Sequence, residues 1–136
     1  MKKTINYELA KKLCEICYVR NIPMPPSSHQ FLWHRYNDED ARVYLLPTES
    51  GENSKVPENV FFPAYTVEEL LSWLPNTLFN NQYTKALIFS PNEKLWVAQY
   101  SSIDLGLEPL HGESSKEMCF AVGKLAVWCI ESEFMK

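Results

Sequence analysis

Apolar residues near the amino end recur three and four positions apart, which is the spacing of one buried helix face. Asn6 precedes this pattern as an N-cap, whereas Asn21 and Pro23 are residue types that end a helix. The apolar stripe consists of Leu9, Leu13, Ile16 and Cys17. The pattern predicts a first amphipathic helix between Asn6 and Asn21.

Two later helices are predicted from the residues of their first turns. Thr66 and Glu69 have the spacing of a capping box, in which each side chain bonds a backbone donor of the other residue, and Pro75 ends this helix. Ser114 and Glu117 repeat the capping-box spacing before a long apolar run. We therefore expect the last helix to open with Ser114 and Glu117.

Two pairs of strands are predicted between the helices, because these stretches are rich in aromatic and branched side chains. The pairs span residues 30–36 with 42–46, and residues 85–90 with 94–101. The first pair flanks a polar turn at residues 37–40, and the second flanks a turn that contains Pro91. Such short connections favour antiparallel pairing within each pair.

The second strand pair indicates how the layers are arranged. Residues 86–89 and 95–98 are apolar at every position, whereas a strand with one wet face alternates. Both faces of the sheet are therefore expected to be covered. The predicted fold is a single α+β domain, residues 1–136, with a mainly antiparallel sheet of about four strands and three helices in the order α-β-β-α-β-β-α, as a helix-sheet-helix sandwich. Residues 47–59 are expected to form an exposed, mobile loop.

Composition and charge mainly exclude certain kinds of partner and location. The apolar share of 46% and the charged share of 22% are typical of a folded globular protein. The net charge of −4 and the pI near 5.4 provide no overall attraction for phosphates, so we expect no nucleic-acid partner. The sequence shows no secretory pattern and no apolar run of about 18 residues, so we expect a cytoplasmic protein with no membrane partner.

Four candidate metal ligands have the sharpest spacing in the chain. Two residues separate Cys14 from Cys17, eleven separate Cys17 from His29, and four separate His29 from His34. This spacing nearly matches that of a zinc finger with two cysteine and two histidine ligands. A finger, however, carries its cysteines on a hairpin and its histidines on a helix, which is the reverse of the elements expected here. Cysteines that pack as small apolar residues are the preferred interpretation, and a zinc-stabilised domain is the alternative.

Known catalytic motifs do not occur in the sequence. The four glycines, at positions 51, 106, 112 and 123, form no phosphate loop, dinucleotide fingerprint or nucleophile elbow. Asp38, Glu39 and Asp40 cluster in a predicted turn, where carboxylates commonly bond the local backbone. His111 falls in a predicted loop. We therefore predict no catalytic residue, cofactor or metal, and keep an enzyme with an unfamiliar site as an alternative.

The first predicted hairpin contains a candidate binding surface. Alternation along its two strands places His34, Tyr36 and Tyr44 on the face opposite the apolar residues Phe31, Trp33, Val43 and Leu45. Aromatic side chains that stay exposed often anchor protein interfaces. If no helix covers this face, His34, Tyr36 and Tyr44 are the predicted binding residues.

The second half of the chain resembles a group of phage proteins. The segments that carry the resemblance are the Thr-x-Glu-Glu start of the second helix, the strand pair ALIFSPNEKLWVAQYSS and the closing helix SSKEMCFAVGKLAVWCIES. Together with the order of elements, they resemble small phage-encoded helix-sheet-helix sandwich proteins of unknown function and similar proteins of gut Bacteroides. The resemblance spans residues 66–131. It implies architecture and a mobile-element origin, and it brings no catalytic residue with it.

These observations favour a non-enzymatic accessory module of phage or mobile-element type. The absence of a catalytic motif, the mild acidity and the surplus of aromatic residues on strands point to contacts with an unknown protein partner. The alternatives are the zinc-stabilised domain and the enzyme with an unfamiliar site.

Overall fold

The computed structural model describes residues 4–25, 31–35, 43–47, 60–104 and 106–134. Its elements are, in order, α1 (Tyr7–Arg20), β1 (Phe31–Arg35), β2 (Val43–Pro47), β3 (Val60–Pro63), α2 (Val67–Trp73), β4 (Thr77–Leu78), β5 (Tyr83–Ser90), β6 (Leu95–Ser102), β7 (His111–Ser115) and α3 (Met118–Glu131). The predicted α+β class and the predicted order of elements are confirmed. The strands β3, β4 and β7 were not predicted.

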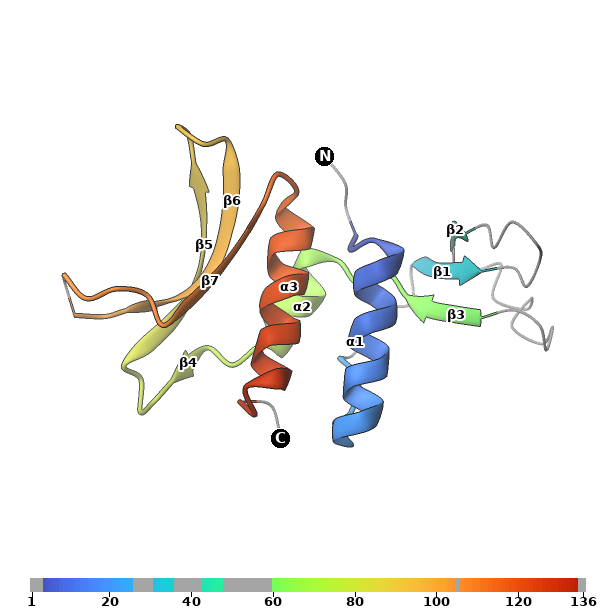
Figure 1. Ribbon diagram of the computed structural model, residues 1–136, viewed down its shortest axis with the longest axis horizontal. Coiled ribbons are helices and arrows are strands. Elements are labelled where there is room, and N and C mark those ends of the chain that lie inside the picture. Colours follow the sequence, from blue (N-terminus) through green and yellow to red (C-terminus); the bar gives the residue numbers. More distant parts are fainter. Residues whose placement is uncertain (1–3, 26–30, 36–42, 48–59, 105, 135–136) are drawn as a thin grey trace.

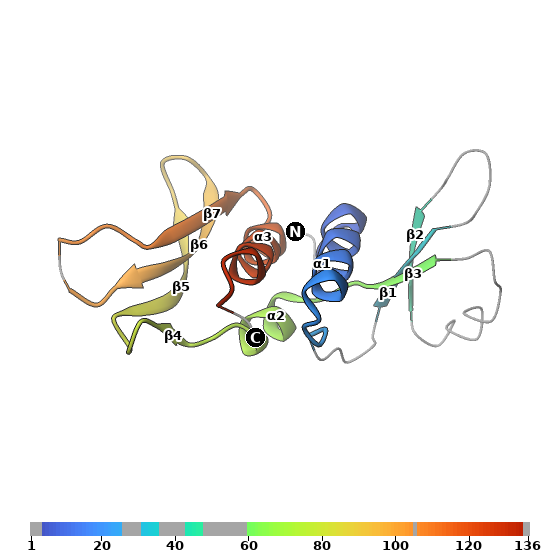
Figure 2. The same ribbon diagram turned by 60° about the horizontal axis from the view of Figure 1, so that its bottom comes forward.

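The strands form two antiparallel sheets, and the helices lie between them (Figures 1 and 2). One sheet has the order β2-β1-β3 and the other has the order β4-β5-β6-β7. α3 packs against β6 and β7, and α1 packs against both α3 and β3. The layered sandwich is therefore confirmed, but its helices form the middle layer instead of the two outer layers.

The first helix begins and ends at the predicted residues. The side-chain oxygen of Asn6 accepts a hydrogen bond from the backbone N–H of Leu9 at 2.9 Å. At the other end, Asn21 adopts a left-handed conformation with φ 54° and closes the helix. Leu13 and Cys17 of the predicted stripe are buried. Among the described residues, no helix is long and apolar enough to cross a membrane.

The two predicted capping boxes have different outcomes. Thr66 Oγ1 accepts from the backbone of Glu69 at 3.3 Å, and Glu69 Oε1 accepts from the backbone of Thr66 at 3.0 Å, which confirms the first box. The second is wrong, because Ser114 pairs with β6 as part of β7 and α3 begins only at Met118. Pairing with a neighbouring strand replaces the local cap at this position.

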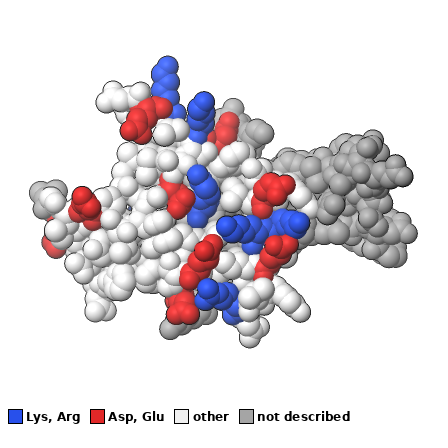
Figure 3. Space-filling view, in the orientation of Figure 1, with Lys and Arg blue, Asp and Glu red and all other residues white. Residues whose placement is uncertain are grey.

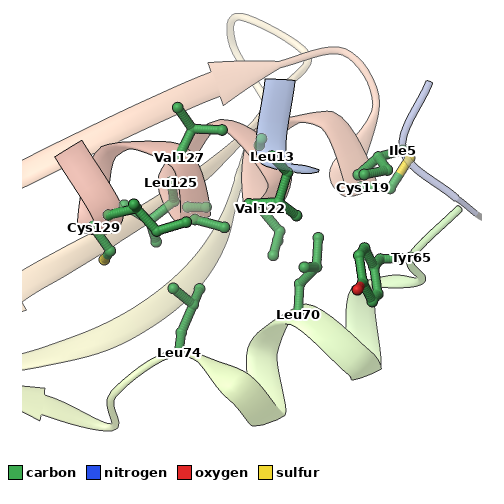
Figure 4. Packing of buried hydrophobic residues seen from close by; sticks show 14 of the residues in the cluster. Ile5, Leu13, Tyr65, Leu70, Leu74, Cys119, Val122, Leu125, Val127 and Cys129 are labelled. Carbon is green, nitrogen blue, oxygen red and sulfur yellow. The ribbon is translucent and has the colours of Figure 1, made fainter. Parts of the chain in front are cut away.

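The core lies where α2 and α1 meet α3 (Figure 4). Leu70 of α2 points toward α3, where Val122 and Leu125 are fully buried. The segment before α1 approaches α3 so closely that a Cβ on Gly123 would lie 2.8 Å from Ile5 Cγ2. α3 is thus the central element of the fold, because both the other helices and one sheet pack on it.

The prediction that both faces of the four-stranded sheet are covered is wrong. On the inner face, which α3 covers, Ala98 and Tyr100 are fully buried. On the outer face Ile88 is 45% exposed, and its apolar neighbours Leu95 and Val97 are half-buried. The continuous apolar pattern here belongs to a sheet with one buried face and one open apolar face.

Some predicted features lie outside the described residues. These are the turn at residues 37–40 with its three carboxylates, the loop from residue 48 to residue 59, and the side chains of His29 and Tyr36. Pro47, which was placed in that loop, is instead the last residue of β2.

Candidate functional site

β5 and β6 form a hairpin beside α3, and a short turn at residues 91–94 joins the two strands (Figure 1). Its two strands pair over their whole length, from Tyr83 opposite Ser102 to Ser90 opposite Leu95. Pro91 cannot continue the ladder, and Lys94 takes the left-handed conformation, with φ 56°, that closes the turn. The hairpin is therefore defined by the local sequence.

The backbone groups of β5 alternate between its two sides. The N–H of Lys85 bonds the carbonyl of Asn76 on the β4 side at 3.0 Å, whereas the carbonyl of Gln82 accepts from Ile103 on the β6 side at 3.1 Å. In an antiparallel strand the N–H and C=O of one residue point to the same side, and this side alternates. Leu87 and Phe89 therefore direct their backbone groups away from β6.

That side of β5 has a neighbouring strand for only a short distance. β4 pairs with Tyr83 and Thr84 alone. Within the described part of the chain, no strand pairs with residues 86–90 on the side away from β6. We call this side of residues 86–90 the open edge. Its sequence, Ala-Leu-Ile-Phe-Ser, contains no charge.

Two large side chains of the open edge are exposed, one on each face of the sheet. Ile88 lies on the outer face and Phe89 on the inner face, and each is 45% exposed. The ring of Phe89 lies against that of Trp96 on β6, with 5.1 Å between the ring centroids. This contact holds Phe89 in place without burying it.

The nearest positive charge does not protect the open edge. The ammonium group of Lys85 turns to the inner face and donates to the carbonyls of Leu71 and Leu74 at the end of α2. Burial there lowers the pKa of Lys85 from its ordinary value. Lys85 thus caps a helix, which leaves residues 86–90 without the charge that commonly protects a sheet edge.

A second candidate place is a shallow cleft of about 200 Å³ between α1, α3 and β7, which is lined by charged residues from all three elements. Figure 3 shows charges of both signs over the helices, and few over the four-stranded sheet. The charged side chains that line the cleft are Lys12, Glu113, Lys124 and Glu131. Lys12 lies 3.8 Å from Glu131, and Lys124 donates to the carbonyl of Ser114 at 2.6 Å.

The imidazole of His111 lies beside this cleft, on β7 and not in the predicted loop. Its ring stacks on Trp128 with 4.3 Å between centroids, and its Nε2 lies 2.5 Å from a carboxylate oxygen of Glu113. Nε2 of His111 thus faces a carboxylate, which is the kind of group that orients an imidazole, and not the hydroxyl or thiol of a nucleophile. Each charged group that lines the cleft therefore has a polar partner: Lys12 pairs with Glu131, Glu113 with His111, and Lys124 with the Ser114 carbonyl.

The structure describes only part of the predicted binding surface. The backbone register of the first hairpin places His34 directly opposite Tyr44, and Trp33 opposite Leu45. This pairing agrees with the alternation from which the surface was predicted. Tyr36 lies outside the described residues. The proposal that His34, Tyr36 and Tyr44 bind a partner stays a prediction.

The cysteines are mainly part of the core. Cys17, Cys119 and Cys129 are buried, whereas Cys14 is half-buried. Burial raises the pKa of Cys17 to about 11, and that of Cys14 rises for the same reason. Within the described residues no group of three or more potential ligands could hold a metal ion. His29 lies outside these residues, so the zinc alternative is not tested.

The open edge was not predicted, although part of its signature is visible in the sequence. The run of apolar residues at positions 86–89 was interpreted as a strand covered on both faces. A strand that is apolar on both faces is also typical of an edge that pairs with another chain. The structure favours the second interpretation, because β4 has only two residues and leaves the rest of this side of β5 without a neighbouring strand among the described residues.

No family model, curated protein or solved structure matches this chain. The resemblance to phage-type sandwich proteins therefore stays a prediction, and the argument on function depends on the structure alone.

Proposed function

We propose that this chain is a non-enzymatic accessory module that binds another protein chain by strand addition at the open edge. The single observation that carries the proposal is the pair of outward-facing backbone positions, Leu87 and Phe89, in an uncharged apolar strand without a neighbour among the described residues. Unpaired backbone groups on a sheet edge are a template for a further strand.

The spacing of these backbone groups supports an extended polypeptide as the ligand. Each position offers one donor and one acceptor, and successive outward positions in a strand are about 7 Å apart. An extended main chain repeats its own donors and acceptors at the same interval. Ile88 and Phe89, exposed on opposite faces, would contact alternate side chains of the added strand.

The other proposed functions have less support from the described residues. For the enzyme alternative, the described residues offer the imidazole of His111, which stacks on Trp128 and pairs with the carboxylate of Glu113. For the zinc alternative, the described residues contain no group of three or more potential ligands, and His29 lies outside them. The aromatic surface of the first hairpin is compatible with the same function at a second place.

Site-specific photocrosslinking in the native host cell tests the proposal. A photoreactive amino acid at position 88 should form a covalent adduct with another protein chain, and the same group at Ile103, which is 60% exposed, should not. The adduct should also disappear in Phe89→Pro, which lacks the outward N–H, but remain in Phe89→Ala, which keeps it. Adducts that form equally at both positions, or that survive in Phe89→Pro, would overturn the proposal.

A further inference from the structure

The open edge is complementary to itself. We infer, as a deepening of the proposed function and resting on it, that the chain added at the open edge is β5 of a second copy of this protein. The two strands pair antiparallel about a twofold axis at Ile88, which joins the four-stranded sheets of both copies into one continuous sheet.

The backbone groups fit this arrangement. Leu87 and Phe89 lie one residue before and one residue after Ile88, so the twofold axis places Leu87 of each copy opposite Phe89 of the other. Both residues direct their N–H and C=O toward the open edge, and such a pair exchanges two hydrogen bonds. The outward backbone groups of Leu87 are then satisfied by Phe89 of the other copy, and those of Phe89 by Leu87 of the other copy.

The lengths of the strands also match. β4 pairs with Tyr83 and Thr84, and Asn76 accepts from Lys85, so an added strand must end opposite Ala86. In the twofold arrangement the residue opposite Ala86 is Ser90 of the second copy, which is the last residue of β5. Pro91 and the turn that follows then direct the second chain away from β4.

The side chains and charges are compatible with the same axis. Ile88 of each copy lies on the outer face, where the two isoleucines form a direct cross-strand contact. On the inner face, Leu87 of one copy meets Phe89 of the other. No like charges oppose each other along residues 86–90, and the ammonium of Lys85 is held at the end of α2. A strand without charge pairs with its own copy at no electrostatic cost.

Sedimentation equilibrium over about 10 µM to about 1 mM tests this inference, because a contact limited to one strand predicts weak, concentration-dependent association. The wild type should form a dimer in this range. Phe89→Pro should weaken dimerisation about tenfold or more relative to Phe89→Ala, since both lose the ring and only the proline variant loses the outward N–H. Thermal unfolding of both variants verifies that they fold.

A second pair of variants keeps the inference testable if proline disturbs the strand. Ile88→Lys places two like charges opposite each other at the axis and should abolish the dimer, whereas Ile103→Lys should leave it unchanged. A wild type that is monomeric at every concentration, or a dimer insensitive to Phe89→Pro and Ile88→Lys, would overturn the inference.

The mass of the photocrosslinked adduct separates this inference from the proposed function. An adduct at position 88 with twice the mass of the chain supports both. An adduct with a different protein, from a chain that is monomeric in solution, would contradict self-pairing and leave strand addition standing. No adduct together with a monomer would contradict both.

Discussion

The two edges of the four-stranded sheet differ in how they are protected. At β7, α3 packs beside the strand, and Lys124 donates to the outward carbonyl of Ser114 at 2.6 Å. At β5, β4 ends after two residues, and residues 86–90 continue without a neighbouring strand in the described part of the chain. The sequences differ in the same sense, because β7 is polar and the open edge is apolar.

Among the described residues, such protection is therefore seen at the β7 edge and not along residues 86–90. A lysine beside the strand and a covering helix are common protections against unwanted strand pairing. Lys85 could supply such a charge at β5, but its ammonium caps α2 instead. This contrast supports the proposal that the open edge is a surface for another chain.

The largest expected effect comes from a disulfide that links two copies of the chain at the open edge. Ile88→Cys should convert almost completely to a covalent dimer under mild oxidation, because directly opposed residues without mutual hydrogen bonds have Cα atoms about 4.5 Å apart, within disulfide range. Nonreducing electrophoresis measures the product. Wild type serves as the control for the half-buried Cys14, and Ile103→Cys as the control for an exposed thiol. Equal crosslinking of the two cysteine variants would contradict the assigned axis.

The next effect contrasts a buried residue with one at the open edge. Leu125→Ala in α3 should lower the free energy of unfolding by about 2–5 kcal/mol, because it leaves a cavity in the core. Ile88→Ala should lower that of the monomer by less than about 1 kcal/mol, since Ile88 is 45% exposed. Urea denaturation at low protein concentration measures both values. Similar losses in the two variants would mean that Ile88 is buried within the monomer.

The smallest effect comes from removing the charge at the protected edge. Lys124→Ala deletes one exposed hydrogen bond to Ser114 and should cost about 0.5–1 kcal/mol of stability in urea denaturation. Self-association should stay unchanged, because α3 still covers β7. A rise in association would show that Lys124 alone protects this edge.

Local rules in the sequence predicted much of the fold. The caps at Asn6 and Thr66 depend on side chains within three residues, and both helices form there. The two hairpins were likewise predicted from apolar runs around short turns. The register of the first hairpin, with His34 opposite Tyr44, agrees with the alternation that suggested the binding residues.

What the sequence did not predict depends on contacts between distant segments. β7 is polar, and it forms a strand because it pairs with β6. The same pairing explains why His111, which was predicted in a loop, lies on a strand and stacks on Trp128. The open edge exists because of strand order, which places β5 beside a short β4. An apolar run alone does not distinguish a strand with two covered faces from one that pairs with another chain.

Residue-resolved amide exchange at high and low protein concentration tests the central claim most directly. The amides of Leu87 and Phe89 should be protected at high concentration and lose protection on dilution, because no strand among the described residues bonds them and a second chain would. The amides of Ile88, which points to β6, and of Lys85, which bonds Asn76, should stay protected at both concentrations. If Leu87 and Phe89 exchange rapidly even at the highest concentration, no chain pairs with the open edge and the account is wrong.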